Sequence, residues 1–408
     1  MPLKKKPVTG MKDILPREMA VRNYCIGLIR STYEQFGFSS IETPVVEHIE
    51  NLQSKQGGEN EKLIFKVLKR GEKLDLSGPT TEDAVTDSGL RYDLTLPLSR
   101  YYAAHAAELP SPFKAIQIGS VFRADRPQRG RYRQFTQCDI DILGDPSYLS
   151  EIDLILATTK VLDRLDFHHF TIRINDRRLL RDTAEKAGFK EGDLEKVFII
   201  LDKMDKIGLD GVRAELLEQY PEEVVEAYLS SFAARGEELT EAETAQMAQV
   251  GSPLAEIIRT VREAKQADFN IVYDPTLVRG MGYYTGPIFE ISMDEFGGSV
   301  GGGGRYDEMI GKFTGQPTPA VGFSIGFERI IMLLLERGFE VDGRSEKVAF
   351  LVEKKLPAEK LGGIFCEAMR LRSEGKTVDI AQMKKNRKFQ KEQLAAEGYT
   401  DIREVFAD

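Results

Sequence analysis

The chain has 408 residues and a formal net charge of −9, so no overall positive field attracts nucleic acid, and such contacts must come from local patches. Its three cysteines are far apart, no CxxC pair occurs, and the four histidines lack metal-ligand spacing, which predicts a reducing compartment and no structural zinc. No long apolar run suits a membrane helix, and the basic first ten residues lack an apolar signal core. We therefore expect a cytoplasmic protein without a membrane partner.

The first predicted elements are a helix and an interrupted strand. Residues 17–36 place apolar side chains at helical spacing, and Gly37 follows as a helix stop. Residues 38–49 (FSSIETPVVEHI) predict a strand that breaks at Pro44, because proline lacks the ladder donor. We expect another subunit to pack at this break. Residues 68–90 are polar, and we expect a loop there.

Residues 90–107 (LRYDLTLPLSRYYAAHAA) start like a strand and continue as a helix. If the RYDLT stretch is extended, Arg91, Asp93 and Thr95 share one face, because strand side chains alternate. A carboxylate and a hydroxyl that face one cleft can hold an ammonium group, such as that of an amino acid. A ladder of surface side chains is the alternative.

Residues 121–144 (VFRADRPQRGRYRQFTQCDIDILG) hold five arginines between two apolar ends, which predicts a β-hairpin. The guanidinium fork matches phosphate and carboxylate oxygens, so this hairpin could grip a polyanion. A solvated basic hairpin is the alternative. The exit strand presents one row of side chains, in which Phe135 could stack on a ligand or pack in the core: Arg133, Phe135, Gln137, Asp139 and Asp141.

The middle of the chain predicts a helical insertion. Residues 147–167 form an amphipathic helical pattern, and residues 170–175 (FTIRIN) alternate like a strand. Residues 177–268 consist of charged helical runs, and strand-rich sequence resumes at residue 269. This order is typical of an α+β domain with a helical insertion.

Two glycine-rich segments follow. In residues 277–286 (LVRGMGYYTG), Arg279 precedes glycines and paired tyrosines, which suits close approach to a ligand or a simple turn with packed rings. Residues 297–326 contain a run of glycines and a small-residue strand that leads to Arg329 at the start of an apolar helix. A flat ligand could lie on this strand, although a tightly packed strand–helix pair is the alternative. Neither a Walker loop nor a strand–GxGxxG–helix pattern occurs.

The C-terminal part predicts a separate small domain. Residues 331–345 form a linker, and residues 346–408 alternate strand, helix, strand and helix, which implies an α/β domain with at least two parallel strands. Its basic stretch, residues 383–391 (MKKNRKFQK), could meet RNA phosphates or be a solvated helix start.

Together and in this order, the segments resemble class II aminoacyl-tRNA synthetases and, more narrowly, the histidyl-tRNA synthetase family over nearly the whole chain. The matching segments are 10–16 (the opening motif), 36–47 (motif 1, with Pro44 at a dimer interface), 122–135 (motif 2), 277–286 (the histidine-specific segment) and 320–330 (motif 3). The resemblance implies an antiparallel sheet flanked by helices in a catalytic core of residues 1–330, with the insertion at 177–268. It also implies that residues 346–408 are a shortened anticodon-binding-like domain.

The resemblance implies a role for each site residue. The ATP site would consist of Arg123 on the α-phosphate, Asp125 at the adenine amino group, Phe135 stacked on the ring, and Arg131 and Arg329 on the phosphates. The histidine site would consist of Asp93, Thr95 and Gln137 at the α-amino end, and Asp141, Tyr283, Tyr284 and Tyr306 towards the imidazole. Arg279 and Arg123 would be catalytic, and Gln128 and Arg129 would contact the tRNA acceptor end.

The implied activity is ligation of L-histidine to tRNA(His) through histidyl-adenylate, in a homodimer that uses ATP with Mg²⁺ carried by the substrate and no metal site of its own. The alternative is a catalytically silent relative, the regulatory subunit of ATP phosphoribosyltransferase in histidine biosynthesis. Arg123, Arg279 and Arg329 favour the enzyme. The sequence departs from the family pattern at Gly282, where aspartate is usual, and in the short C-terminal segment.

Overall fold

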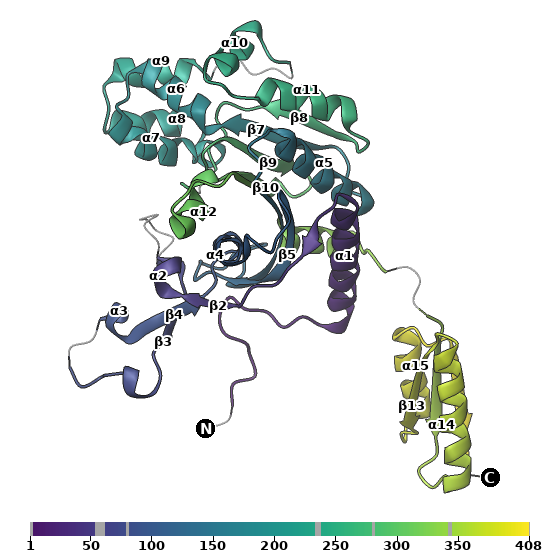
Figure 1. The fold of residues 1–408 in the computed structure, drawn as a ribbon. Coiled ribbons are helices and arrows are strands. Elements are labelled where there is room, and N and C mark those ends of the chain that lie inside the picture. Colours follow the sequence, from purple (N-terminus) through teal and green to yellow (C-terminus); the bar gives the residue numbers. More distant parts are fainter. Residues whose placement is uncertain are drawn as a thin grey trace. The chain divides into compact units, whose positions relative to one another are not determined.

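A computed structural model describes residues 3–53, 62–78, 81–232, 238–279, 282–341 and 345–407. The chain divides into two compact units, Met1–Phe339 and Glu340–Asp408, which are described separately. Figure 1 shows the elements of both units.

The first unit is built on an eight-stranded sheet in the order β1-β5-β6-β11-β10-β9-β7-β8. In that order the strands are Ser39–Ser40, Phe113–Phe122, Gln134–Leu143, Ala320–Ile325, Gly298–Arg305, Pro287–Met293, Phe170–Asp176 and Phe269–Tyr273. The inner pairs are antiparallel, and only the edge pairs β1–β5 and β7–β8 are parallel. The predicted fold class, an antiparallel sheet flanked by helices, is confirmed.

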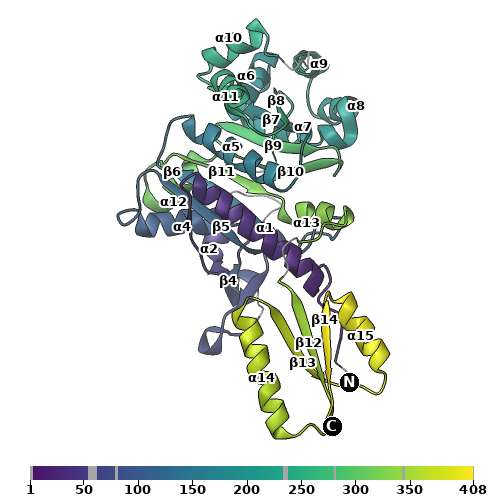
Figure 2. The same ribbon diagram turned by 90° about the vertical axis from the view of Figure 1, so that its right-hand side faces the viewer.

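Helices cover one face of this sheet. They are α1 (Pro16–Gln35), α5 (Leu149–Arg164), α11 (Leu254–Ala264) and α13 (Phe327–Glu336), and Figure 2 shows α1 and α5 lying across the strands. The stripe that α5 turns to the sheet is largely apolar, as the periodicity predicted, because Leu154, Ile155 and Val161 are all buried. The buried Glu151 is an exception, and it pairs with Arg305 of β10 at 2.6 Å. On the other face, α4 (Thr95–His105) and α12 (Asp307–Thr314) pack together. That face carries the site.

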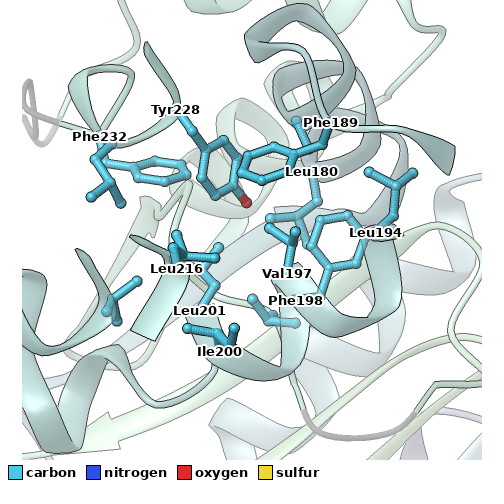
Figure 3. Close-up of a cluster of buried hydrophobic side chains, with 14 of the residues drawn as sticks. Leu180, Phe189, Leu194, Val197, Phe198, Ile200, Leu201, Leu216, Tyr228 and Phe232 are labelled. Atoms are coloured by element: carbon cyan, nitrogen blue, oxygen red, sulfur yellow. The ribbon is translucent and has the colours of Figure 1, made fainter. Parts of the chain in front are cut away.

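The insertion helices lie between β7 and β8, and the first four of them share a core. They are α6 (Arg177–Ala187), α7 (Leu194–Leu201), α8 (Met204–Leu217), α9 (Glu222–Ser230), α10 (Glu241–Gln249) and α11. Figure 3 shows the cluster of buried side chains, in which Tyr228 packs edge-to-face against Phe189 and Phe232. Leu277 and Val278 belong to the same cluster, so the insertion packs directly on the segment that leads to Arg279.

A small second sheet corrects one prediction. Its order is β2-β4-β3, with β2 at Val46–His48, β4 at Thr86–Leu90 and β3 at Lys66–Leu68, and short helices α2 (Ile49–Leu52), α3 (Glu82–Val85) and η2 (Gly71–Lys73) lie beside it. The expected loop over residues 68–90 is therefore wrong for residues 82–90. The polar strand β4 forms because it has a ladder partner on each side, which local polarity does not reveal. The predicted break at Pro44 is confirmed, since β1 ends before it and β2 begins after it.

The second unit is a three-stranded parallel sheet with a helix on each face. Its strands β12 (Lys347–Val352), β13 (Thr377–Gln382) and β14 (Asp401–Val405) lie in the order β13-β12-β14, and its helices are α14 (Ala358–Ser373) and α15 (Arg387–Ala396). Alternation along β12 separates the two cores. Val348, Phe350 and Val352 pack with Ile364 of α14, while Ala349 and Leu351 pack with Leu394 of α15.

Strand β10 approaches both neighbours unusually closely because it is made largely of glycine. A Cβ atom placed on Gly303 would lie closer than 3.0 Å to the backbone of Gly322 on β11, and one on Gly304 would lie 2.8 Å from the carbonyl oxygen of Pro287. Backbone atoms cannot give way as a flexible side chain can. The glycine run is therefore a requirement of the sheet, and it also leaves its surface open to ligands and long side chains.

We expect Gly303→Ala to destabilise the protein by about 1–3 kcal/mol or more, because the added methyl group overpacks a backbone contact. The matched control is Gly298→Ala in the same strand, where the nearest atom to a Cβ lies 3.9 Å away. Thermal unfolding of both variants measures the difference. Equal melting temperatures would contradict this account of β10.

Candidate active site

A cavity of about 910 Å³ opens on the uncovered face of the large sheet, a volume typical of ligand sites. Most of the residues predicted from the sequence line it: Asp93, Thr95, Arg123, Asp125, Arg131, Phe135, Gln137, Asp141, Arg279, Tyr283, Tyr284, Tyr306 and Arg329. They come from segments up to 236 residues apart, as the numbers of Asp93 and Arg329 show (329 − 93). The structure therefore brings residues 93–95, 123–141, 279–284 and 306–329 to one place.

Gln128 and Arg129 are not among the cavity-lining residues. They lie in the turn between β5 and β6, which is closed by a bridge between Gln128 and Arg131 and by Gly130 at φ 69°. The exposed guanidinium of Arg129 pairs with Glu336 at 2.8 Å. The predicted hairpin is confirmed. Gln128 and Arg129 lie outside the cavity, whereas Gly130 and Arg131 of the same turn line it.

One wall of the cavity is cationic. The Arg123 guanidinium lies 4.2 Å from the ring centroid of Tyr92 and 5.2 Å from that of Phe135, and its Nε donates to the Tyr92 carbonyl at 3.1 Å. Within the described parts of the chain, Arg123, Arg131 and Arg329 have no carboxylate partner. Burial lowers the pKa of Arg329, and the positive charges of Arg131 and Arg279 lower it further. Such a group of uncompensated arginines suits a polyanion.

An ion pair behind this wall positions Arg329. Its neighbour Glu328 accepts hydrogen bonds from Arg22 of α1 at 2.7 Å and from the Thr136 backbone N–H at 3.0 Å. Arg22 is itself buried and also donates to the Thr136 hydroxyl at 3.0 Å. Helix α13 is thereby tied to β6 and α1, so the start of the helix cannot shift independently of the hairpin.

The opposite wall holds buried carboxylates. Burial raises the pKa of Asp93 and raises that of Asp139 well above its usual range. Burial also raises the pKa of Asp141 to about 7, although the Tyr306 hydroxyl donates to it at 2.6 Å and lowers it in part. Only a glycine at position 322 leaves room for Asp141, since a Cβ there would lie closer than 3.0 Å to its Oδ1.

Three buried polar atoms in the cavity have no hydrogen-bond partner among the described residues: Gln137 Oε1, Asp141 Oδ2 and Arg279 Nε. Buried polar groups are normally paired, because an unpaired one forfeits its hydration. All three project from predicted site residues. Their partners are therefore expected to come from a ligand.

Arg279 lies against the glycine strand. Its Nη1 donates to Glu290 on β9 at 2.7 Å, and a Cβ on Gly302 would lie 2.8 Å from its Cζ. Its backbone has φ 62°, an unfavourable region for a residue with a side chain. The following Gly280 and Met281 lie outside the described residues. At Gly282, where aspartate is usual in the family, a Cβ would lie 3.7 Å from the Glu195 carboxylate.

The tyrosines close the carboxylate end. The rings of Tyr283 and Tyr284 have centroids 4.8 Å apart, and Tyr283 meets Tyr306 edge-on at 6.1 Å. With the rings packed in this way, the Tyr306 hydroxyl donates a hydrogen bond to the Asp141 carboxylate. An aromatic pocket with a carboxylate at its base suits a flat, polar ring.

The predicted strand face of Arg91, Asp93 and Thr95 is wrong. Strand β4 ends at Leu90 and α4 begins at Thr95, because the Asp93 carboxylate accepts the Leu96 N–H at 3.1 Å and caps the helix. Arg91 points elsewhere and donates to the carbonyls of Thr43 (2.7 Å) and Ser120 (2.8 Å). Asp93 and Thr95 still reach the cavity, but Arg91 is not among its lining residues.

Several lining residues had no predicted role, among them Tyr92, Asp139, Ser324 and Glu290. Asp139 was in the predicted row of the exit strand without a role, and its carboxylate accepts a hydrogen bond from Ser324. Glu290 is a lone carboxylate in an apolar strand, a signal that could have marked it. The insertion also lines the cavity between Leu201 and Lys206, for which the sequence holds no signal.

Metal-binding clusters and membrane-spanning helices are both missing from the ranges that the structure describes. No group of three or more His, Cys, Asp or Glu side chains there could hold a metal ion. None of the helices there is both long and apolar enough to cross a membrane.

Comparisons with known proteins show the family to which the chain is similar. The family model described as histidyl-tRNA synthetase matches residues 10–330. A histidine–tRNA ligase of Leifsonia xyli subsp. xyli is 42% identical over 421 aligned residues, covering 98% of this chain and 95% of that protein. A crystal structure of histidyl-tRNA synthetase from Nostoc sp. PCC 7120 is 27% identical and superposes with a TM-score of 0.74 over 97% of this chain and 90% of that one.

A structure described as an ATP phosphoribosyltransferase regulatory subunit/histidyl-tRNA synthetase, from Bacillus halodurans, is 19% identical, covers 100% of both chains and has a TM-score of 0.76, so it shares the fold. The family resemblance seen in the sequence is confirmed by the match over residues 10–330 and by the identity to the Leifsonia ligase. The chain belongs to the histidyl-tRNA synthetase family.

Proposed function

We propose that this chain ligates L-histidine to tRNA(His) in two steps, through a histidyl-adenylate. The observation that carries the proposal is a single cavity with uncompensated arginines on one wall and buried carboxylates with tyrosines on the other. The first wall suits the phosphates of ATP, and the second suits an amino acid with a polar ring. The family's reaction is ATP-dependent.

The ATP end is assigned to the cationic wall. Arg123 would bind the α-phosphate, while Arg131 and Arg329 would bind the phosphates farther along. Phe135 would stack on adenine, with Asp125 at its amino group. Mg²⁺ arrives with ATP and neutralises phosphate charge, and it needs no protein ligand set in this assignment.

The histidine end is assigned to the carboxylate wall. Asp93, Thr95 and Gln137 would hold the α-ammonium group, for which a buried carboxylate and the unpaired amide oxygen of Gln137 are suitable acceptors. Asp141 and Tyr306 would bind the imidazole, between the rings of Tyr283 and Tyr284. Buried hydrogen-bonding groups reject substrates that cannot pair with them, more strongly than apolar pockets sieve by size.

The chemistry needs no protein nucleophile. An oxygen of the histidine carboxylate attacks the α-phosphorus, the bond to the bridging oxygen breaks, and pyrophosphate leaves. Negative charge grows on the phosphate oxygens, and Arg123 and Arg279 would stabilise it. In the second step, the terminal ribose hydroxyl of the tRNA attacks the adenylate carbonyl and AMP leaves.

The regulatory subunit remains the alternative function. Such a subunit needs no arginines for adenylate chemistry. Arg123, Arg279 and Arg329 all line the cavity, and the backbone strain at Arg279 is typical of a functional position. We therefore favour the enzyme.

We also propose how the chain divides into domains and which of them contacts RNA. The catalytic core would span residues 1–330 and the linker 331–345, with residues 346–408 as the shortened anticodon-binding-like domain. In that domain, Lys391 already pairs with Glu404, whereas Lys384, Lys385 and Lys388 have no ion pair with any described residue, which supports an RNA contact.

The partner assignments are proposals too. Gln128 and Arg129, at the exposed hairpin tip, would meet the tRNA acceptor end. A homodimer is supported by exposed Val45 and Val46 beside Pro44, and sedimentation as a monomer would contradict it. We place the protein in the cytoplasm, since the family's tRNA substrate is found there.

The purified protein should exchange labelled pyrophosphate into ATP only when histidine is added, because adenylate formation is reversible and requires the amino acid. The other nineteen amino acids serve as controls. Histidine binding without exchange would instead support the regulatory alternative. Charging of tRNA(His) transcripts then tests the second step.

Arg279→Ala should lower the rate of adenylate formation by about 10²-fold or more, since one preorganised donor to a developing charge commonly contributes that much. Histidine affinity, measured by calorimetry, should change little, because the arginine acts in the transition state. Arg181→Ala, on α6 and outside the cavity, is the control. Near-normal turnover of Arg279→Ala would remove this residue from the mechanism.

Asp141→Asn should stabilise the ligand-free protein at high pH relative to the wild type. The folded pKa of Asp141 is raised to about 7, so this carboxyl is neutral at low pH and becomes a buried charge as the pH rises through 7. The unfolded carboxyl ionises at about pH 4 and the folded one only at about pH 7, so the wild type loses stability across this window. The melting temperatures should be similar at about pH 4, diverge in favour of the variant up to about pH 7, and differ by a constant amount above it. Asp210→Asn, at a nearly fully exposed carboxylate, should show no such divergence, and histidine binding should be lost only in Asp141→Asn.

A further inference from the structure

A row of directly paired residues crosses six strands of the large sheet beneath the cavity. Directly paired residues project from the same face of a sheet. The row runs through Gln117 (β5), Asp139 (β6), Ser324 (β11), Gly302 (β10), Glu290 (β9) and Arg173 (β7). Gly302 contributes no side chain, and the guanidinium of Arg279 lies over it. Arg279 therefore fills the gap in a polar row that reaches from β5 to β7.

Glu290 lies between two arginines in this row. Its Oε2 accepts from Arg279 at 2.7 Å, and its Oε1 accepts from Arg173 at 3.3 Å. The Glu290 side chain is only 13% exposed, so water competes little for either oxygen. The carboxylate cannot rotate away from Arg279 without also leaving Arg173.

Arg173 is held on its other side by two more carboxylates. Its Nε donates to Asp274 at 2.7 Å, and its Nη1 donates to Asp205 at 2.7 Å. Asp274 is fixed in the segment after β8, where it accepts the Thr276 N–H at 2.9 Å. Asp205 instead belongs to the first turn of α8 in the insertion. Arg173 therefore joins the sheet to the insertion.

The same part of the insertion borders the cavity. Leu201 and the following Asp202 at the end of α7, and Met204, Asp205 and Lys206 at the start of α8, are lining residues, and Arg173 lines the cavity as well. A displacement of these helices relative to the sheet would move Asp205 away from Arg173. The ion pairs thus run without interruption from the insertion to Arg279.

We propose that Arg173 is a positioning residue that orients Glu290, and through it Arg279, and that its bond to Asp205 makes adenylate formation depend on the placement of the insertion. This inference rests on the proposed function. It adds to that function a residue, Arg173, that affects the reaction through Glu290 and Arg279. Loss of such a residue affects the rate of the chemical step more than the binding of histidine.

The test compares Arg173→Gln, Asp205→Asn and the control Asp210→Asn in single-turnover adenylate formation. We expect Arg173→Gln to be slower by about tenfold to a hundredfold, because small displacements of catalytic groups have effects of that size. Asp205→Asn should be slower by about threefold, as is common for residues that couple two parts of a protein. Asp210 lies farther along α8, beyond a kink at Gly208, and among the described residues its ion pair is with its neighbour Arg213, so its variant should match the wild type.

Asp205→Asn keeps the test valid if Arg173→Gln folds poorly, because an exposed ion-pair partner contributes little to stability. Histidine affinity should stay within about twofold in all variants. Combining each substitution with Arg279→Ala should give no additional loss, since the effect passes through that arginine.

Two outcomes would overturn the inference. One is an Asp205→Asn rate equal to that of the wild type. The other is an equal further loss from Arg173→Gln in the Arg279→Ala background, which would indicate a purely structural role. An unsubstituted protein that forms no adenylate would contradict the proposed function itself, so the two failures are distinguishable.

Discussion

The close packing of strand β10 is the constraint on which the site depends. Because Gly302 has no side chain, the guanidinium of Arg279 can lie directly on the sheet beside Glu290. Gly322 on the neighbouring strand β11 leaves room for the Asp141 carboxylate in the same way. Charged side chains thus lie directly on the hydrogen-bonded backbone, away from bulk water. Electrostatic interactions are stronger at such a place than in solvent. Any larger side chain at these glycines would displace the groups or separate the strands.

Forming such a surface reduces the free energy of unfolding, because it buries ionisable groups. Asp93, Asp139 and Asp141 are buried with raised pKa values, and no cation in the described structure neutralises them directly. The arginines opposite are left without carboxylate partners. The charge of Arg123 lowers the pKa of Asp93 and of Asp139 in part, but it forms no ion pair with either carboxylate in the described structure. The molecule therefore keeps opposite charges separated in one cavity, ready for a ligand that carries both a phosphate chain and an ammonium group.

The insertion belongs to the same arrangement. Its core includes Leu277 and Val278, so the segment leading to Arg279 packs against helices that lie between β7 and β8. The ion pairs of Arg173 add a second connection on the surface of the sheet. One connection is apolar and the other polar, and both converge on the same residue. The backbone strain at Arg279 is supported from two directions.

The sequence alone determined the local features: the helices, the hairpin, the row from Phe135 to Asp141, the break at Pro44 and, through the order of its motifs, the family. These follow from periodicities of two and 3.6 residues and from proline chemistry, which need no distant partner. Only the tertiary structure decided that Arg91 turns away from the cavity, that β4 is a strand, and that Glu290 and Arg173 support Arg279. Those outcomes depend on the register of strands far apart in sequence, which sets which side chains meet and which glycine leaves them room.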